Sequence, residues 1–483
     1  MIDGDIAYNA LVSHDSRFDG VFFVGVLSTG IYCRPICPAR TPKRENCHFF
    51  TSAEAAEKAD FRPCLRCRPE LAPGNAPVDG VQRIAHLMAR QMEEGLIHEG
   101  GTMEAIAQQF SLSSRQLRRI IHQEFGVSPI ELIQTRRLLL AKQLLTDTKL
   151  PIIQVVFASG FTSVRRFNEV FRKHYKMPPS RLRKEAFLQD KKAQDIQTIT
   201  LQLSYRPPYD GDKMLAFLKA RSIKGVEYIT ESSYARTVDL GKYQGWFKVT
   251  HIPQKHALLV ELPHTLTPVL PALLSRLRHL FDLNTRPDLI YTQLIQDKQL
   301  KNSMEWHPGM RVPGAFDGFE MAIRAILGQQ ITVKAATTIA CRFAEALGES
   351  IVTPFPELYL LTAKPEQVVA KTIDDIAKLG IISARARSIL ALAQAFTTGT
   401  FHLRPGVNPE KIINQLLNLP GIGQWTAHYI AMRALHWPDA FPKEDIAIRN
   451  RLGGISAQAA EERSQCWRPW RSYAVLHIWN GIN

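Results

Sequence analysis

Any fold of the N-terminal region has to accommodate four cysteines that stand in two close pairs. Cys33 and Cys37 are separated by three residues, and Cys64 and Cys67 by two. Two such pairs at this interval are typical of tetrahedral Zn²⁺ coordination by four thiolates. The alternative is four unrelated thiols, and Cys47, which has no partner at short spacing, is treated as a spare. The spacing therefore predicts a small domain folded around one zinc ion.

Length and charge point to several domains and a polyanionic partner. The chain has 483 residues, too many for one ordinary core. Lys and Arg exceed Asp and Glu by 60 to 45, which gives a net charge of +15 at pH 7. This balance favours either nucleic acid or an anionic membrane surface. About half of the excess falls within residues 81–185, whereas a uniformly basic surface would spread it along the chain.

The sequence carries no recognisable export or membrane signal. No apolar run approaches the ~20 residues of a membrane span. The first residues, Met1 to Asp5, lack the basic and apolar regions of a signal peptide. We therefore expect a cytoplasmic protein whose seven cysteines are not joined in disulfides.

The basic middle of the chain reads as helices, because its apolar residues recur every three or four positions. Residues 102–119 predict a helix, a tight turn and a second helix, and residues 153–168 repeat the pattern around Gly160. The second helix of such a pair can lie in the major groove of DNA. Arginines on a solvated helix face are the alternative, but they do not explain the doubled motif. The candidate DNA contacts are Arg115, Arg118, Arg165, Arg166 and Asn168.

Two resemblances account for the front half of the chain. Residues 5–70 resemble the N-terminal domain of the Ada family, through segments 29–40 and 61–69 around the cysteine pairs. Residues 83–185 resemble the DNA-binding domain of the AraC family. The Ada resemblance implies that Cys33 is the nucleophile that takes a methyl group from a methylated DNA phosphate. Zinc would hold Cys33 as the reactive thiolate.

The implied zinc site also suggests a binding switch. Four thiolates outweigh the charge of Zn²⁺, so the site is negative and repels DNA phosphate. Methylation of Cys33 removes one of those negative charges, and weaker repulsion should tighten DNA binding. The acceptor is spent in the reaction and does not turn over.

The back half begins with a strand-rich segment and ends in helices. Apolar and polar residues alternate from Thr198 to about Pro271, around a helical piece at residues 212–221. From Leu273 onward the pattern is helical, with a Gly-rich turn at residues 419–423. The glycines of this turn, Gly421 and Gly423, would let backbone N–H groups meet a DNA phosphate. Taken alone, the turn is explained equally well as a helix C-cap.

Residues 197–483 resemble the helix-hairpin-helix Gly/Pro–Asp glycosylases, specifically those of the 3-methyladenine DNA glycosylase II (AlkA) type. The matching segments are 316–330, 425–429, 442–445 and 467–479. The resemblance implies that Asp445 is the catalytic carboxylate and that Trp425, Tyr429 and Trp479 line the base pocket. The alternative is that these aromatics belong to the core and that Glu444 and Asp445 are a solvated pair.

Three departures refine the expected activity. Trp425 stands where relatives with lyase activity carry a Lys, so a monofunctional hydrolase is expected. Only Cys466 lies near the C-terminus, too few cysteines for an iron–sulfur cluster. Gln330 stands where relatives often carry a Leu wedge, so a polar side chain would enter the DNA at the flipped base.

We therefore predict a multidomain, mainly α chain with four parts. They are a small α/β zinc methyl-acceptor domain, an all-α double helix-turn-helix domain, a small α/β (TBP-like) domain and an all-α helix-hairpin-helix glycosylase domain. The expected bounds are residues 1–72, 81–185, 197–271 and 272–483. Linkers are expected at 71–77 and 183–197. No Pro-Cys-His-Arg motif occurs, so the guanine O6-methyltransferase domain of the Ada family is not expected.

The predicted function is alkylation repair joined to a transcriptional response. The expected partners are double-stranded DNA, at damaged sites and at a promoter operator, and RNA polymerase during activation; no membrane partner is expected, and we expect a monomer. The main alternative is a non-catalytic regulator whose C-terminal part only senses alkylation. A membrane-surface protein would explain the charge but none of the motifs.

Overall fold

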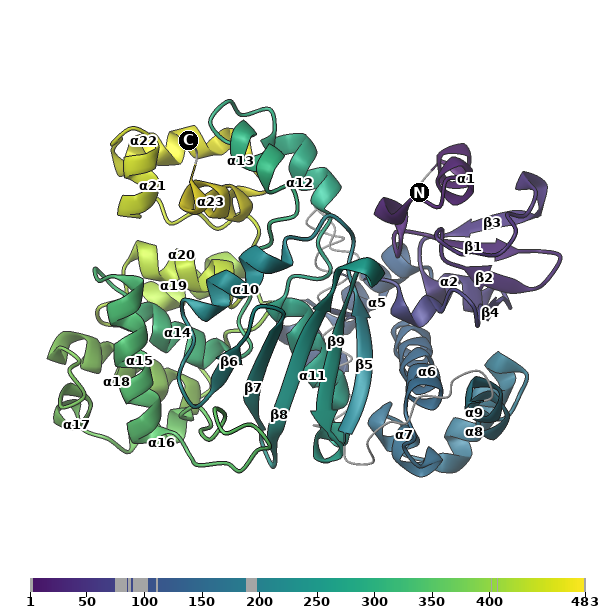
Figure 1. Cartoon of the computed structure of the whole chain (residues 1–483), viewed down its shortest axis with the longest axis horizontal. Helices are drawn as coiled ribbons and strands as arrows, with labels where there is room; N and C mark the ends of the chain where they lie inside the picture. The colour runs from purple at the N-terminus through teal and green to yellow at the C-terminus, as the bar shows by residue number, and fades with distance from the viewer. Residues whose placement is uncertain are drawn as a thin grey trace. The chain divides into compact units, whose positions relative to one another are not determined.

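The computed structural model describes residues 3–73, 85, 88–89, 103–109, 112–187, 198–400, 402–405 and 407–481 (Figure 1). They group into two compact units. The first comprises Met1–Pro207, Ile252–Ser275 and Leu283–Arg286, and the second Pro208–His251, Arg276–Asp282 and Pro287–Asn483. Residues 74–77 and 188–197 of the expected linkers lie outside the described residues. Among the described helices, none combines the length and the apolar character that a membrane crossing requires.

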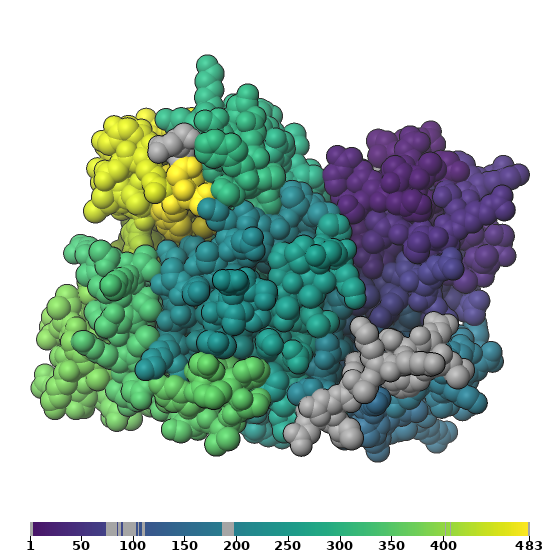
Figure 2. Space-filling model, viewed as in Figure 1, coloured from purple at the N-terminus to yellow at the C-terminus, as the bar shows by residue number. Residues whose placement is uncertain are grey.

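The N-terminal part of the first unit is a small α/β fold. Its strands form one sheet in the order β3-β1-β2-β4, in which β1 is antiparallel to β2 and β3, and β4 is parallel to β2. The hydroxyl of Ser52 accepts the backbone N–H of Ala55 and so caps α2. Its elements are α1 (Gly4–Val12), η1 (Ser16–Phe18), β1 (Phe23–Val26), β2 (Ile31–Cys33), η2 (Arg44–Asn46), β3 (Cys47–Phe50), α2 (Ala53–Lys58), β4 (Arg62–Pro63) and η3 (Pro69–Leu71). In Figure 2 the purple atoms of this part form one continuous packed mass.

Among the described residues of the first unit, six helices follow and confirm the doubled helix-turn-helix pattern. They are α4 (Met103–Gln109), α5 (Ser114–Phe125), α6 (Pro129–Asp147), α7 (Ile152–Ala158), α8 (Val164–Tyr175) and α9 (Pro179–Phe187). Serine hydroxyls cap α5, α6 and α8 from Ser113, Ser128 and Ser163. Each second helix, α5 and α8, buries one apolar stripe and leaves its other face polar. The long helix α6 joins the two motifs.

The strand-rich segment also has the expected elements. In the first unit, β5 (Thr198–Ser204) pairs antiparallel with β9 (Ala257–Pro263), with Leu201 opposite Val260. In the second unit, β6 (Glu227–Ile229), β7 (Ser233–Leu240) and β8 (Tyr243–Ile252) are consecutive antiparallel strands. The helical piece predicted at 212–221 is α10 (Gly211–Lys219). The remaining elements are η4 (Pro253–Lys255), η5 (His264–Val269) and α11 (Leu270–Leu280).

A helical bundle completes the second unit and positions the candidate pocket. Helix α14 (Gly318–Leu327) is apolar on nearly every side, so it lies at the centre and packs against α18 and α20. The other helices are α12 (Pro287–Leu294), α13 (Lys301–Trp306), α15 (Val333–Leu347), α16 (Pro365–Val369), α17 (Ile373–Ala377), α18 (Ser383–Thr397), α19 (Pro409–Leu417), α20 (Gln424–Arg433), α21 (Ile446–Arg451), α22 (Ala457–Ser464), η6 (Gln465–Trp467) and α23 (Arg471–Asn480).

Candidate functional sites

The four cysteines of the two pairs converge at one end of the N-terminal sheet. Cys33 ends β2, and Cys64 directly follows β4, the strand beside it. The sulfurs of Cys33, Cys37, Cys64 and Cys67 all lie within 4.8 Å of one another. A tetrahedral site with Zn–S bonds of about 2.3 Å separates its sulfurs by about 3.8 Å. The arrangement fits a zinc ion, and it confirms the predicted metal cluster.

The backbone around this cluster is arranged to receive negative charge. The N–H of Arg34 points to Cys67 Sγ at 3.3 Å, and the N–H of Arg66 to Cys64 Sγ at 3.3 Å. The buried guanidinium of Arg34 forms an ion pair with Asp19 and donates to the carbonyl of Cys67 at 3.1 Å. N–H groups directed at sulfur stabilise thiolates. The donors around the cluster therefore suit a thiolate–metal site.

Cys33 differs from its three neighbours in exposure. It is partly exposed, whereas Cys37, Cys64 and Cys67 are buried. Hydrogen bonding with Cys37 raises the pKa of Cys33, while hydrogen bonding with Cys33 lowers that of Cys37 to about 7. A metal ion bound by the four sulfurs would hold Cys33 as a thiolate at neutral pH. Cys47 lies apart in β3, where its thiol donates to the carbonyl of Lys43 at 3.3 Å.

The candidate DNA contacts of the helix-turn-helix part lie on the polar faces of α5 and α8. Arg115 and Arg118 are exposed on α5, opposite buried Leu117 and Ile121. On α8, Arg165 and Arg166 are exposed and Asn168 is half-buried. Arg166 pairs with Glu169 at 3.1 Å, one turn along the same helix. Both helices thus present arginine to solvent along one face.

The Gly-rich turn joins α19 to α20 as a helical hairpin. Gly421 has φ +73°, and a Cβ there would lie 2.3 Å from the hydroxyl of buried Ser388, so the position requires glycine. Gly423 has open space around it and caps α20. The amide of Gln329 donates to the carbonyl of Gly421 and to Thr426 Oγ1, both at 2.9 Å. These bonds tie the turn to the loop after α14.

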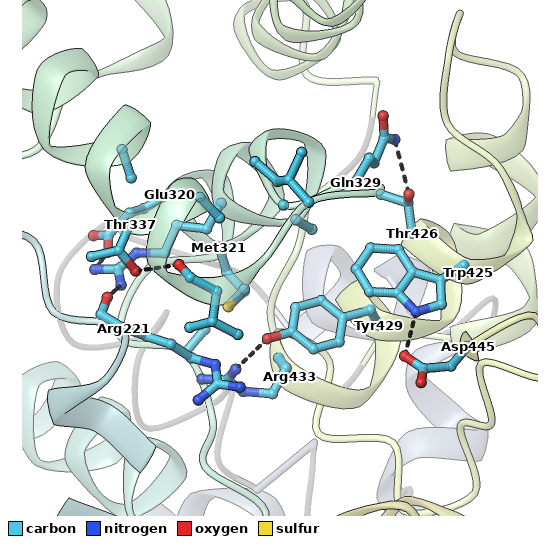
Figure 3. A pocket seen from close by; sticks show the side chains of 18 of the residues that line it. Arg221, Glu320, Met321, Gln329, Thr337, Trp425, Thr426, Tyr429, Arg433 and Asp445 are labelled. Carbon is cyan, nitrogen blue, oxygen red and sulfur yellow. Dashed lines mark hydrogen bonds and ion pairs between the residues drawn. The ribbon is translucent and has the colours of Figure 1, made fainter. Parts of the chain in front are cut away.

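Asp445 is held by three N–H donors at the start of α21. Its Oδ2 accepts the indole N–H of Trp425 at 2.8 Å (Figure 3). Its Oδ1 accepts the indole N–H of Trp479 at 3.3 Å and the backbone N–H of Ile448 at 2.9 Å. Three donors fix the orientation of the carboxyl group.

Aromatic rings line the cavity beside Asp445. Trp425 and Tyr429 lie nearly parallel, with centroids 5.3 Å apart, and Trp479 faces Tyr429 at 6.1 Å. The cavity has a volume of about 1300 Å³, above the ~300–1,000 Å³ of an ordinary small-molecule pocket. It is thus large enough for a nucleotide turned out of a duplex. Gly421, Gly423, Gln330, Trp425, Tyr429, Asp445 and Trp479 all line it.

A buried arginine that sequence reasoning missed lies behind Tyr429. Arg433 donates to the Tyr429 hydroxyl at 2.8 Å (Figure 3). It also donates to the carbonyls of Pro313 and Gly314. Burial alone would raise the pKa of Tyr429, but the charges of Arg433 and Arg221 lower it below its ordinary value. The spacing of four residues between Tyr429 and Arg433 places them on one helix face and could have revealed the pair.

The opposite end of the cavity is charged and internally paired. Glu320 on α14 forms ion pairs with Arg236 and Arg324, and Arg324 also pairs with Glu227. The lowered pKa of Glu320, about 2, reflects these arginines overcoming the cost of burial. Because these charges compensate one another, the aromatic end is the part suited to a flat organic group.

Gln330 occupies the rim of the cavity in an unusual conformation. Its side chain is exposed and its φ is +54°, in the left-handed region that non-glycine residues seldom adopt. Neighbouring Gln329 is anchored to the hairpin, which holds Gln330 at the cavity mouth. The sequence identified Gln330 as a candidate DNA contact, but it did not reveal the left-handed backbone conformation at this position.

Comparison with protein families covers most of the chain. Residues 7–70 match the family described as metal binding domain of Ada, and residues 106–185 match a helix-turn-helix domain. Residues 200–317 match the AlkA N-terminal domain, and residues 323–472 match the HhH-GPD superfamily of base excision DNA repair proteins.

Curated relatives extend the similarity to the whole chain. It is 36% identical, over 99% of its length and 97% of the relative's, to a probable bifunctional transcriptional activator/DNA repair enzyme AlkA of Mycobacterium tuberculosis. It is 36% identical to DNA-3-methyladenine glycosylase 2 of Escherichia coli, over 57% of this chain and 95% of that protein. Among solved structures, a 3-methyladenine DNA-glycosylase from Archaeoglobus fulgidus shares the fold, with a TM-score of 0.51 at 16% identity, over 58% of this chain and 97% of that one.

Proposed function

We propose that this chain, which belongs to the family of bifunctional transcriptional activator/DNA repair enzymes of the AlkA type, hydrolyses the N-glycosidic bond of alkylated purines in DNA and accepts methyl groups at Cys33. The observation that carries the first activity is the Asp445 carboxylate held beside an aromatic cavity. The second rests on the exposure of Cys33 within the four-sulfur cluster.

The aromatic end of the cavity suits a cationic purine. A purine methylated at N3 or N7 carries positive charge, and the electron-rich faces of Trp425, Tyr429 and Trp479 attract cations by about 0.5–2 kcal/mol each. The indole N–H groups of both tryptophans are already bonded to Asp445, so the rings offer their faces. The pocket therefore favours 3-methyladenine-type lesions over uncharged bases.

Asp445 acts on the sugar side of the bond. A positive base leaves with the bonding electron pair as a neutral molecule, so the base needs no proton. The bond between C1′ and the base nitrogen breaks, and positive charge develops on the sugar, where the fixed carboxylate stabilises it. Water then adds to C1′ and releases a proton. Three N–H donors fix both oxygens of Asp445 in place, so the carboxylate is positioned for electrostatic stabilisation of that charge.

Trp425 favours simple hydrolysis over strand cleavage. Lyase chemistry needs an amine that forms a Schiff base with the sugar. At this hairpin position the chain offers an indole already engaged with Asp445. The expected product is an intact strand with an abasic site.

Backbone groups at the hairpin are suited to hold the DNA. Gly421 shapes the turn, and the open space around Gly423 would let a phosphate approach the backbone N–H groups at the start of α20. Gln330 at the rim would enter the space left by the flipped nucleotide and present an amide to the opposite base. Arg115, Arg118, Arg165, Arg166 and Asn168 would bind a promoter operator through α5 and α8.

Base release tests the glycosylase proposal. Methylated duplex DNA incubated with the protein should yield free 3-methyladenine above the spontaneous rate, while the strands stay uncut until alkali is added. A parallel sample without protein measures spontaneous depurination. Release equal to that control would favour the alternative, a non-catalytic alkylation-sensing regulator.

The methyl acceptor is tested by mass spectrometry. A duplex with one methylphosphotriester should transfer a single methyl to Cys33: the sulfur attacks the methyl carbon and the phosphate diester leaves with the electron pair. Transfer removes one negative charge from the zinc site and should raise DNA affinity. We propose that the methylated chain then activates transcription by contacting RNA polymerase, and that it acts as a monomer. A methyl group found on Cys37 or Cys47 would contradict the assignment of Cys33 as the methyl acceptor.

A further inference from the structure

A buried ion pair joins the segment after β4 to the helix-turn-helix part of the first unit. This segment, residues 64–71, carries Cys64 and Cys67 and is called the zinc loop below. Lys142 lies on α6 and Glu70 in η3, and each side chain is 1% exposed. The ammonium of Lys142 pairs with Glu70 and donates to the carbonyl of Cys64, one of the four clustered cysteines, at 3.2 Å. One side chain of α6 therefore reaches the backbone of the zinc site.

Arg68 adds a second connection from the same loop. It follows Cys67 directly, and its guanidinium pairs with Glu70 at 3.0 Å and with Asp147, at the end of α6, at 2.7 Å. Glu70 is thus shared between a cation from the zinc loop and a cation from α6. Lys142, Glu70, Arg68 and Asp147 are thus linked in one chain of ion pairs at the junction.

A third connection involves the second helix-turn-helix. Glu57 on α2 accepts the hydroxyl of Thr135 on α6 at 3.2 Å and pairs with His174 on α8 at 3.1 Å. Its other oxygen accepts the hydroxyl of buried Tyr32, in the strand that ends at Cys33, at 3.1 Å. Both α6 and α8 are therefore bonded to α2, which is in turn bonded to the strand that ends at Cys33.

Lys142 occupies an unusual place for a lysine. Its helical neighbours Leu138, Ala141 and Leu145 are fully buried, so a hydrophobic residue would fit the same position. A buried ion pair adds little stability compared with hydrophobic packing, but it tolerates only the arrangement in which both charges meet. The pair therefore specifies how the zinc loop and α6 dock.

We propose that Lys142 is a positioning residue that holds the methyl-acceptor site against the DNA-binding helices. The negative charge of that site then repels the phosphates of any DNA that those helices bind. This inference rests on the proposed binding switch. Charges act strongly only within about 10 Å at physiological salt. A zinc site that moved freely on a linker would leave DNA affinity unaffected by methylation. When the site is docked, its negative charge weakens the protein–DNA complex, and methylation of Cys33 reduces this repulsion.

The test uses the full chain with Lys142→Met and Glu70→Gln combined, which removes the pair without leaving a lone buried charge. The probe is an unmodified duplex of mixed sequence, bound by protein before and after methylation by a methylphosphotriester duplex. Lys149→Met is the matched control, since Lys149 is exposed just beyond α6. Hydrogen exchange of residues 64–71 and 135–147 and zinc content are measured on the same proteins.

For the wild type and Lys149→Met we expect methylation to raise affinity about tenfold, the effect of one unit charge near a phosphate in a partly aqueous setting. The double variant should keep one zinc per chain and accept the methyl, yet gain less than about twofold. Its unmethylated form should bind at least as tightly as the unmethylated wild type, because the repulsive site is released. General misfolding would instead weaken both forms.

A double variant with a wild-type affinity gain would overturn the inference. If the wild type itself shows no gain, the proposed switch is wrong, and hydrogen exchange then decides the docking separately. Faster exchange in residues 64–71 and 135–147 of the double variant supports the docking role, and unchanged exchange refutes it.

Discussion

The carboxylate of Asp445 receives three N–H donors, two of them from tryptophans 20 and 34 residues away in the chain. The family resemblance identified all three side chains but gave no reason for the tryptophans beyond stacking. Their indole nitrogens fix the carboxylate, and their rings line the cavity that would receive the base. In the proposed mechanism each tryptophan would both contact the base and position Asp445, and sequence spacing does not reveal the hydrogen bonds that join them.

His428, on the same helix as Trp425, gives a pH dependence at the residue level. Burial, helped by the charge of Arg471, lowers the pKa of His428 to about 4, whereas an unfolded histidine titrates near 6.5. The folded state therefore favours neutral His428. The free energy of unfolding therefore has its full value above pH 6.5. It falls by up to about 3 kcal/mol as the pH decreases towards 4, because the unfolded state takes up a proton on this histidine first.

We expect His428→Phe, which keeps a ring against Trp437, to flatten this dependence. Urea unfolding followed by tryptophan fluorescence at pH 7 and pH 4.5 measures it. The wild type should lose more stability than the variant on acidification. Equal losses in the two proteins would show that His428 is not held neutral.

At the level of elements, the hairpin offers two glycines with different structural demands. Gly421 has a positive φ and faces Ser388, whereas Gly423 has an ordinary φ and open surroundings. Gly421→Ala should destabilise the second unit by about 1–3 kcal/mol through strain and the close contact. Gly423→Ala should leave the melting temperature unchanged and weaken binding to abasic duplex DNA, because its methyl group meets the approaching phosphate.

Thermal unfolding and DNA affinity, measured on both variants, separate the two effects. Equal melting temperatures for Gly421→Ala and the wild type would contradict the structural argument. Unchanged affinity in Gly423→Ala would remove this glycine from the phosphate contact.

Local patterns predicted the helices and strands well, for a physical reason. The apolar stripes of α5 and α8 repeat within one or two turns, so periodicity reveals them. The same holds for β5 and α10. The junction of Lys142 with Glu70 was missed because it links residues 72 positions apart, although a lysine on the buried stripe of α6 was a visible signal.

At the level of the whole chain, the order of parts follows from family resemblance and not from composition. Net charge indicated a nucleic-acid partner, and the cysteine spacing indicated a metal, but neither distinguishes repair from regulation. The cavity is assembled from residues between Phe217 and Trp479, and only the folded chain shows that they meet. The proposed bounds of the four domains remain a prediction.

We propose that the second unit excises alkylated bases by means of Asp445. Single-turnover release of 3-methyladenine tests this proposal most directly. Glu444→Gln is the matched control, since it changes the neighbouring carboxylate, which also lines the cavity. Asp445→Asn should lower the rate at least 100-fold, about 2.7 kcal/mol or more of lost transition-state stabilisation. It should still bind abasic duplex DNA, and Glu444→Gln should keep most of the wild-type rate. Wild-type release by Asp445→Asn, after subtraction of spontaneous depurination, would contradict the account.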